Sequence, residues 1–232
     1  MLPWLGRGAS TRQNFLEDWC GALPAPLMDA YHKLEQRWNT LDELGSVALC
    51  GAKKLGERNE ARKAAQQCGI AGEFLNRLAD ELITATDIMQ TEARHFPIVP
   101  TIEPMAPTNY RSMSVRWSIS LALVLHQVTF SERNRFFNKL RALDRVVEVL
   151  CDEFLESVDS LLRQPERLTS TRWDELERLD YDLNTCLQEG LVVLKCFLRA
   201  VPKETSLAIA AHLDAPISRR ARPARRATEV SV

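Results

Sequence analysis

The chain has 232 residues, of which 45% are hydrophobic and 26% are charged, and its 30 basic and 31 acidic residues leave a formal net charge of −1. A chain of this length and apolar content can bury a sizeable core, in one large domain or in two smaller ones. The balanced charge argues against nucleic-acid binding over the whole surface, because such proteins carry a strong basic excess.

The beginning of the chain changes from an irregular to a helical pattern. Residues 1–26 contain three prolines and are expected to be irregular, with a possible short helix at 13–20. A long helix is predicted from residue 27 onward, because apolar residues recur at alternating steps of four and three. This spacing is typical of helices that pack nearly parallel or antiparallel to one another. The members of this first seam are Leu27, Tyr31, Leu34, Trp38, Leu41, Ala48, Ala52 and Leu55, with Gly45 on the same line.

A second seam with the same spacing runs from Ala61 to Met89, in a phase that is shifted by two residues. The shift predicts a break or kink near Gly56, where two lysines precede a glycine as they do at many helix C-termini. Gly69 and Gly72 offer an alternative break, and the sequence does not decide between the two places. The two seams together predict a helical hairpin over 27–96.

Four prolines lie within residues 97–109 and predict an extended connection, because proline cannot continue a helix. Beyond this connection the pattern is again helical, in stretches at 111–130, 131–164 and 170–201, with a short helix at 207–213. The predicted fold is therefore all-α, an antiparallel bundle of about five long helices.

The end of the chain differs from the rest in charge. Residues 217–232 hold five arginines and one acid, so this segment carries +4 and the remainder of the chain −5. It lacks apolar periodicity and is predicted to be a disordered tail. An arginine cluster of this kind can bind an acidic protein, acidic lipid or nucleic acid, or it can simply keep the tail soluble. Its members are Arg219, Arg220, Arg222, Arg225 and Arg226.

A metal or ligand site is one alternative that the sequence leaves open. Glu92 and His95 form an E-x-x-H pair, and two such pairs with two further glutamates hold the metals of di-metal helical bundles. This chain has one such pair, and His126 and Asp180 are the other polar residues within apolar helical stretches. A solvated helix end and a hydrogen-bonded core histidine are the plainer interpretations of these residues. No cofactor is predicted.

Acidic residues recur at steps of three and four on the helices predicted at 131–164 and 170–201. At this spacing they predict a solvated helix face, or alternatively a docking face for a basic partner. Acid–base chemistry would require them to line a cleft that shifts their pKa values. These residues are Asp144, Glu148, Asp152, Glu156 and Asp159 on the first helix, and Asp174, Glu177 and Asp182 on the second.

The compartment and the membrane alternative follow from the apolar stretches and the cysteines. Six cysteines occur without CxxC spacing, and the first residues form no signal sequence, so reduced thiols and a cytoplasmic protein are expected. The stretch nearest in character to a membrane span, Trp117–Phe130, has fourteen residues without a charge, fewer than the roughly 20 that span a bilayer. A membrane-peripheral protein that uses the basic tail and the apolar helix at 113–130 remains an alternative.

The sequence favours a non-enzymatic helical bundle that mediates protein–protein interaction, with another protein or with a second copy of itself. No serine, cysteine or lysine stands in a nucleophile motif, and no glycine-rich phosphate-binding loop is present. Long heptad seams on helices are typical of association surfaces as well as of cores. An adaptor, a regulator or an assembly subunit would fit this pattern.

Overall fold

The structure, a computed structural model, describes residues 23–97, 100 and 132–215. The regular structure within these residues is entirely helical, which confirms the predicted all-α fold. The predicted helix at 111–130, most of the connection at 97–109, the first 22 residues and the tail at 217–232 lie outside the described residues. The described helices are α2 (Ala25–Glu57), α3 (Ala61–Ala93), α5 (Glu132–Arg163), α6 (Ser170–Ala200) and α7 (Ser206–Asp214), with 3-10 turns at Pro165–Arg167 and Lys203–Thr205.

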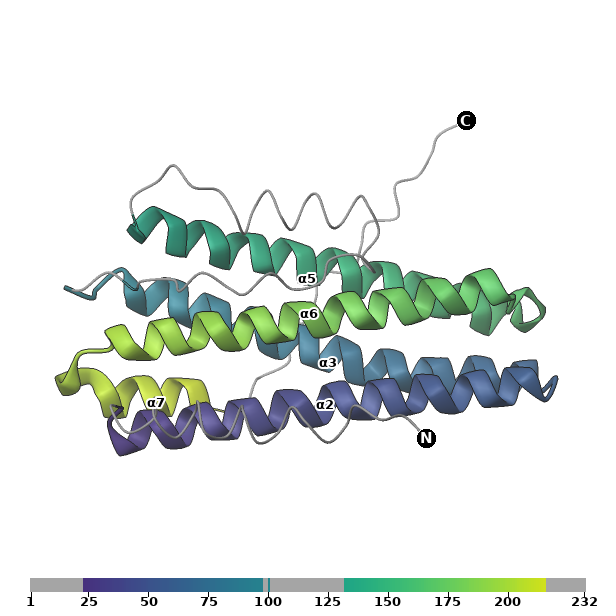
Figure 1. Cartoon of the computed structure of the whole chain (residues 1–232), viewed down its shortest axis with the longest axis horizontal. Helices are drawn as coiled ribbons and strands as arrows, with labels where there is room; N and C mark the ends of the chain where they lie inside the picture. Colours follow the sequence, from purple (N-terminus) through teal and green to yellow (C-terminus); the bar gives the residue numbers. More distant parts are fainter. Residues whose placement is uncertain (1–22, 98–99, 101–131, 216–232) are drawn as a thin grey trace, which may run out of the picture.

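The four long helices form an antiparallel bundle, in which each helix runs opposite to the one before it (Figure 1). α3 packs on α2, α5 on α3 and α6 on α5, and α6 also lies beside α2. The short helix α7 turns back after α6 and packs on α2, where Lys33 forms an ion pair with Asp214 at 2.6 Å. A bundle of this kind explains the seven-residue spacing of the seams.

The helix boundaries settle the open question about the hairpin. The chain breaks at residues 58–60, near Gly56, and both Gly69 and Gly72 lie inside α3. Asn59 has φ 60°, a left-handed conformation that asparagine tolerates better than most residues. α2 begins at Ala25, two residues earlier than predicted, because Pro26 in the first turn needs no backbone hydrogen bond there.

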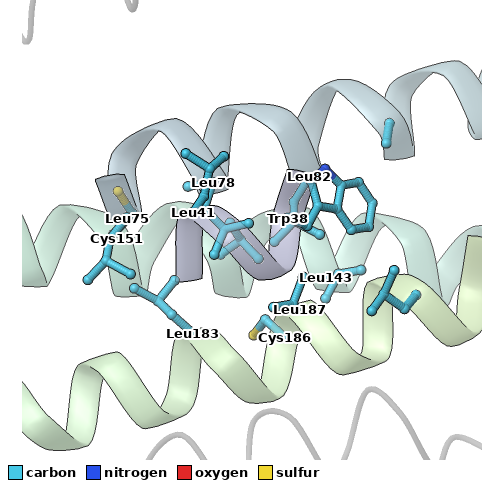
Figure 2. Packing of buried hydrophobic residues seen from close by; sticks show 14 of the residues in the cluster. Trp38, Leu41, Leu75, Leu78, Leu82, Leu143, Cys151, Leu183, Cys186 and Leu187 are labelled. Atoms are coloured by element: carbon cyan, nitrogen blue, oxygen red, sulfur yellow. The ribbon is translucent and has the colours of Figure 1, made fainter. Parts of the chain in front are cut away.

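The predicted seams face the core of the bundle (Figure 2). Every member of the first seam is buried except Leu55, which is half-buried. Gly190 of α6 lies at the centre of this packing, where a Cβ atom would stand 2.7 Å from Leu82 Cδ2, 3.5 Å from Trp38 and 3.7 Å from Leu143. The missing side chain at Gly190 therefore lets side chains from the three other long helices meet α6 closely.

Replacing Gly190 with Ala is expected to lower the free energy of unfolding by roughly 1 kcal/mol. Moving buried Leu82 costs about 1 to 3 kcal/mol, and the better helix propensity of alanine offsets up to about 1 kcal/mol of this. Gly51 is the matched control, because a Cβ atom there would meet only Gln67 at an ordinary 3.8 Å. Gly51→Ala is expected to raise stability by about 0.5 to 1 kcal/mol in the same urea titration. Equal gains for both variants would contradict the close packing around Gly190.

Candidate functional site

The predicted metal candidates do not come together in the described structure. Glu92 Oε1 lies 3.2 Å from His212 Nδ1 and so joins α3 to α7, while the nearby His95 is exposed. Asp180, on α6, accepts a hydrogen bond from the Ser46 hydroxyl of α2 at 2.9 Å. His126 lies outside the described residues.

The spacing of the helices gives the separation between these candidates. Gly45 meets Leu75 and Arg37 pairs with Glu81, so a residue near the start of α2 stands opposite Glu92. That position is about 20 residues from Ser46, or about 30 Å along the helix. Glu92 and Asp180 therefore lie in different parts of the bundle. Among residues 23–97, 100 and 132–215, no group of three His, Cys, Asp or Glu side chains could hold a metal ion.

The prediction of a solvated acidic face is wrong for two residues: Asp144 is half-buried against α3, and Asp182 is fully buried. Asp144 accepts hydrogen bonds from the Thr86 hydroxyl and, at 3.0 Å, from the Gln90 amide. Burial raises the pKa of Asp144 to about 6, against the opposing effect of these hydrogen bonds. The Asp144 side chain contacts α3 rather than pointing into solvent. The regular spacing of the acids along α5 does not distinguish Asp144 from the solvated ones.

Asp182 is the more extreme case, because its side chain is completely buried. Neither carboxylate oxygen has a hydrogen-bond partner within the part of the chain that the structure describes. Burial raises the pKa of Asp182 to about 6, Arg178 opposes this rise, and the negative charge of Glu153 adds to it. An unpartnered ionised carboxylate in such a place opposes folding.

A line of polar contacts joins α2 to α6. Ser46 donates to Asp180, and the Asn184 amide donates to Asp42 at 2.5 Å. Burial raises the pKa of Asp42, and it raises that of Asp180 to about 6. These hydrogen bonds connect specific residues of the two helices, so they fix the axial position of α6 relative to α2.

Sequence reasoning missed a buried ion pair between α5 and α6. Lys139 Nζ lies 2.9 Å from Glu189 Oε2, and their side chains are only 7% and 1% exposed. Neither carboxylate oxygen of Glu189 accepts a well-aligned hydrogen bond from the described residues, so electrostatic attraction to Lys139 is the main interaction of this carboxylate. The only sign in the sequence was that each charge stands directly before a core residue: Lys139 before the seam residue Leu140, and Glu189 before Gly190.

An exposed apolar cluster is the second feature that the sequence did not reveal. Leu44 and Val47 of α2 are 41% and 62% exposed, Ile70 of α3 is 43% exposed, and Phe74 is half-buried. Val47 is nine residues after Trp38 and so lies about half a turn around α2 from the core. Because Gly45 stands opposite Leu75 and Gly51 opposite Gln67, these side chains share the outer face of the hairpin. We call this surface the α2–α3 patch.

The cysteines in the described residues carry no disulfide. Cys50 is exposed, and Cys68, Cys151, Cys186 and Cys196 are buried. Burial raises the pKa of Cys68 to about 11 and raises that of Cys186 as well, so these two thiols are poor nucleophiles at neutral pH.

No family model, curated protein or solved structure matches the chain. Among the described helices, none combines the length and the apolar character that crossing a membrane requires.

Proposed function

We propose that this chain acts by binding rather than by catalysis, and that the α2–α3 patch holds a helix of another protein or of a second copy. The observation that carries the proposal is the exposure of Leu44, Val47 and Ile70, by 41%, 62% and 43%, on the two packed helices α2 and α3. Single exposed apolar residues are common, but a cluster on one face is typical of an interaction surface.

The surroundings of the patch also suit an interface. Glu43, Lys54, Glu73 and Arg77 are exposed around it, so an apolar centre has a polar rim that carries both charges. The hairpin beneath is closely packed, because a Cβ atom on Gly45 would stand only 2.9 Å from Leu75. A partner would therefore meet a preformed surface, which reduces the entropy lost on binding.

Two of the carboxyl groups with raised pKa values connect helices to each other, which supports binding rather than catalysis. Asp144 is engaged with Thr86 and Gln90 between α3 and α5. Asp180 is engaged with Ser46 between α2 and α6. Both groups thus connect helices to each other, which accounts for their burial without a catalytic role.

The double substitution Val47→Glu with Ile70→Glu is expected to weaken association through the patch at least about 10-fold. Burying each apolar side chain contributes about 1.5 to 3 kcal/mol, and glutamate removes that contribution. Sedimentation velocity over a concentration series measures self-association, and quantitative proximity labelling in the source cell measures other partners.

The control is Leu207→Glu, because Leu207 is 73% exposed but lies on α7, away from the patch. It should leave both measurements at the wild-type level. If the double variant keeps both the self-association and the labelled neighbours of the wild type, the patch is not the binding surface and the proposed function fails.

A further inference from the structure

α6 buries more of its circumference than the core of a four-helix bundle requires. Leu183 faces the core, and at about 100° per residue Thr185 and Cys196 lie about 200° and 220° around the helix from it. Both side chains therefore point away from the core, yet they are only 7% and 3% exposed. Tyr181, on the same side but one turn nearer the start of α6, is 43% exposed. The outer side of α6 is thus covered over its later part only.

The neighbouring surface of α5 is covered in the same way. Ala142 lies about 100° around α5 from the core residue Leu143 and is only 7% exposed, and Val146 is 6% exposed. Val149, further along α5, is 37% exposed. The covered surface thus lies between the first half of α5 and the second half of α6. We call it the α5–α6 groove; its residues are Ala142, Val146, Asp182, Thr185, Glu189, Val193, Cys196 and Ala200.

The dimensions of the groove suit one helix. Residues 182–200 of α6 extend over about 27 Å at 1.5 Å per residue. Ala142, Thr185, Cys196 and Ala200 are small, which allows another helix to approach closely. Val146 and Val193 provide apolar contact surface, since both are buried.

The path of the chain indicates what occupies the groove. The Phe96 ring stacks on the Phe197 ring with centroids 5.3 Å apart, so α3 ends beside the last turns of α6. α5 begins at the same end of the bundle (Figure 1). The 31 residues at 101–131 must therefore leave and return at one end of the groove. An extended outward path of ten residues covers about 33 Å, and a return helix of twenty residues covers about 30 Å. The two lengths are similar, so the chain between 101 and 131 is long enough to run along the groove and return.

We propose that the α5–α6 groove is the docking site of residues 111–130 of the same chain, as a fifth helix antiparallel to α5. This segment contains Trp117–Phe130, fourteen residues without Asp, Glu, Lys or Arg. A helix that is apolar on all sides requires contact on more than one face, and the groove between two helices supplies two. Docking within the chain would also withhold this segment from a membrane surface.

Hydrogen exchange of the full-length protein tests the docking. Amides of 117–130 are expected to exchange as slowly as those of the α2–α3 hairpin. Val193→Asp, inside the groove, is expected to speed exchange at 117–130 at least about 10-fold while residues 64–82 stay protected. The matched control is Val149→Asp, because Val149 is also a valine, lies on α5 beyond the groove and is 37% exposed. This control should leave 117–130 protected.

Fast exchange at 117–130 in the wild type would overturn the proposal, and so would an unchanged rate in Val193→Asp with an intact hairpin. A second measurement decides the case in which Val193→Asp unfolds the whole bundle. A photo-crosslinking benzoylphenylalanine in place of Thr185 is expected to form its adduct within 111–130 of the same chain. An adduct only to a second copy or to added acidic vesicles would show that something else covers the groove, and the absence of any adduct would contradict the docking.

Discussion

Replacing Lys139 with Met is expected to lower the free energy of unfolding by about 3 to 5 kcal/mol, the usual cost of removing one partner of a buried ion pair. Lys139 supplies the positive charge 2.9 Å from Glu189, whose side chain is 1% exposed. Without it, the Glu189 carboxylate stays buried and loses the ion-pair partner that the described residues give it. Urea unfolding at pH 7, followed by circular dichroism, measures the loss.

Two controls separate the ion pair from simple loss of packing. The double variant Lys139→Met with Glu189→Leu removes both charges, and its stability is expected within about 1 kcal/mol of the wild type or above it. Lys63→Met removes an exposed partner of Glu60, so its effect is expected to stay below about 1 kcal/mol. If Lys139→Met costs no more than Lys63→Met, the buried pair contributes little to folding.

The seams and the hairpin break could be predicted from the sequence because both are local consequences of helix geometry. The alternating three- and four-residue steps identify the inward side of a helix, whichever helix lies against it. Trp38, Leu75 and Leu82 are buried as this spacing requires. The phase shift near Gly56 marks the break for the same reason, because two helices in a hairpin have independent phases.

The buried charges could not be predicted, because their surroundings depend on which helices become neighbours. Asp174 and Asp182 belong to the same acidic series on α6, yet Asp174 is exposed and Asp182 is fully buried. Only the position of α5 and of whatever covers the outer side of α6 distinguishes them. The α2–α3 patch has the same origin, since Val47 and Ile70 are 23 residues apart and lie on one face of the protein only when the hairpin forms.

The metal candidates show a related difficulty. Glu92 lies where the second seam predicts an inward residue, but that seam ends beside α7, so its neighbour is His212. Asp180 sits far along the bundle, opposite Ser46. The seam spacing predicts which way a side chain points, but not its position along the bundle axis. Two residues can bind the same metal only if both their directions and their axial positions agree.

Asp182→Asn is expected to raise the free energy of unfolding at pH 7 by about 1 to 2 kcal/mol. Burial raises the pKa of Asp182 from 3.8 to about 6, so the folded state favours the protonated carboxyl. Below about pH 3.8 the carboxyl is protonated in both the folded and the unfolded state and costs no stability. As the pH rises through about 6, the folded state must hold a buried negative charge, and stability is lost. Two pKa units correspond to about 3 kcal/mol at neutral pH, and an unpartnered amide retains part of that penalty.

The pH dependence distinguishes this effect from a general improvement in packing. The gain of Asp182→Asn over the wild type should shrink as the pH falls from 7 to 4, because the wild-type carboxyl becomes neutral. Asp144 and Asp180 titrate in the same range but are present in both proteins, so the difference isolates Asp182. Asp174→Asn, at an exposed position on the same helix, should change stability by less than about 0.5 kcal/mol at either pH. If Asp182→Asn destabilises the protein equally at pH 4 and pH 7, the buried carboxylate does not oppose folding and the prediction fails.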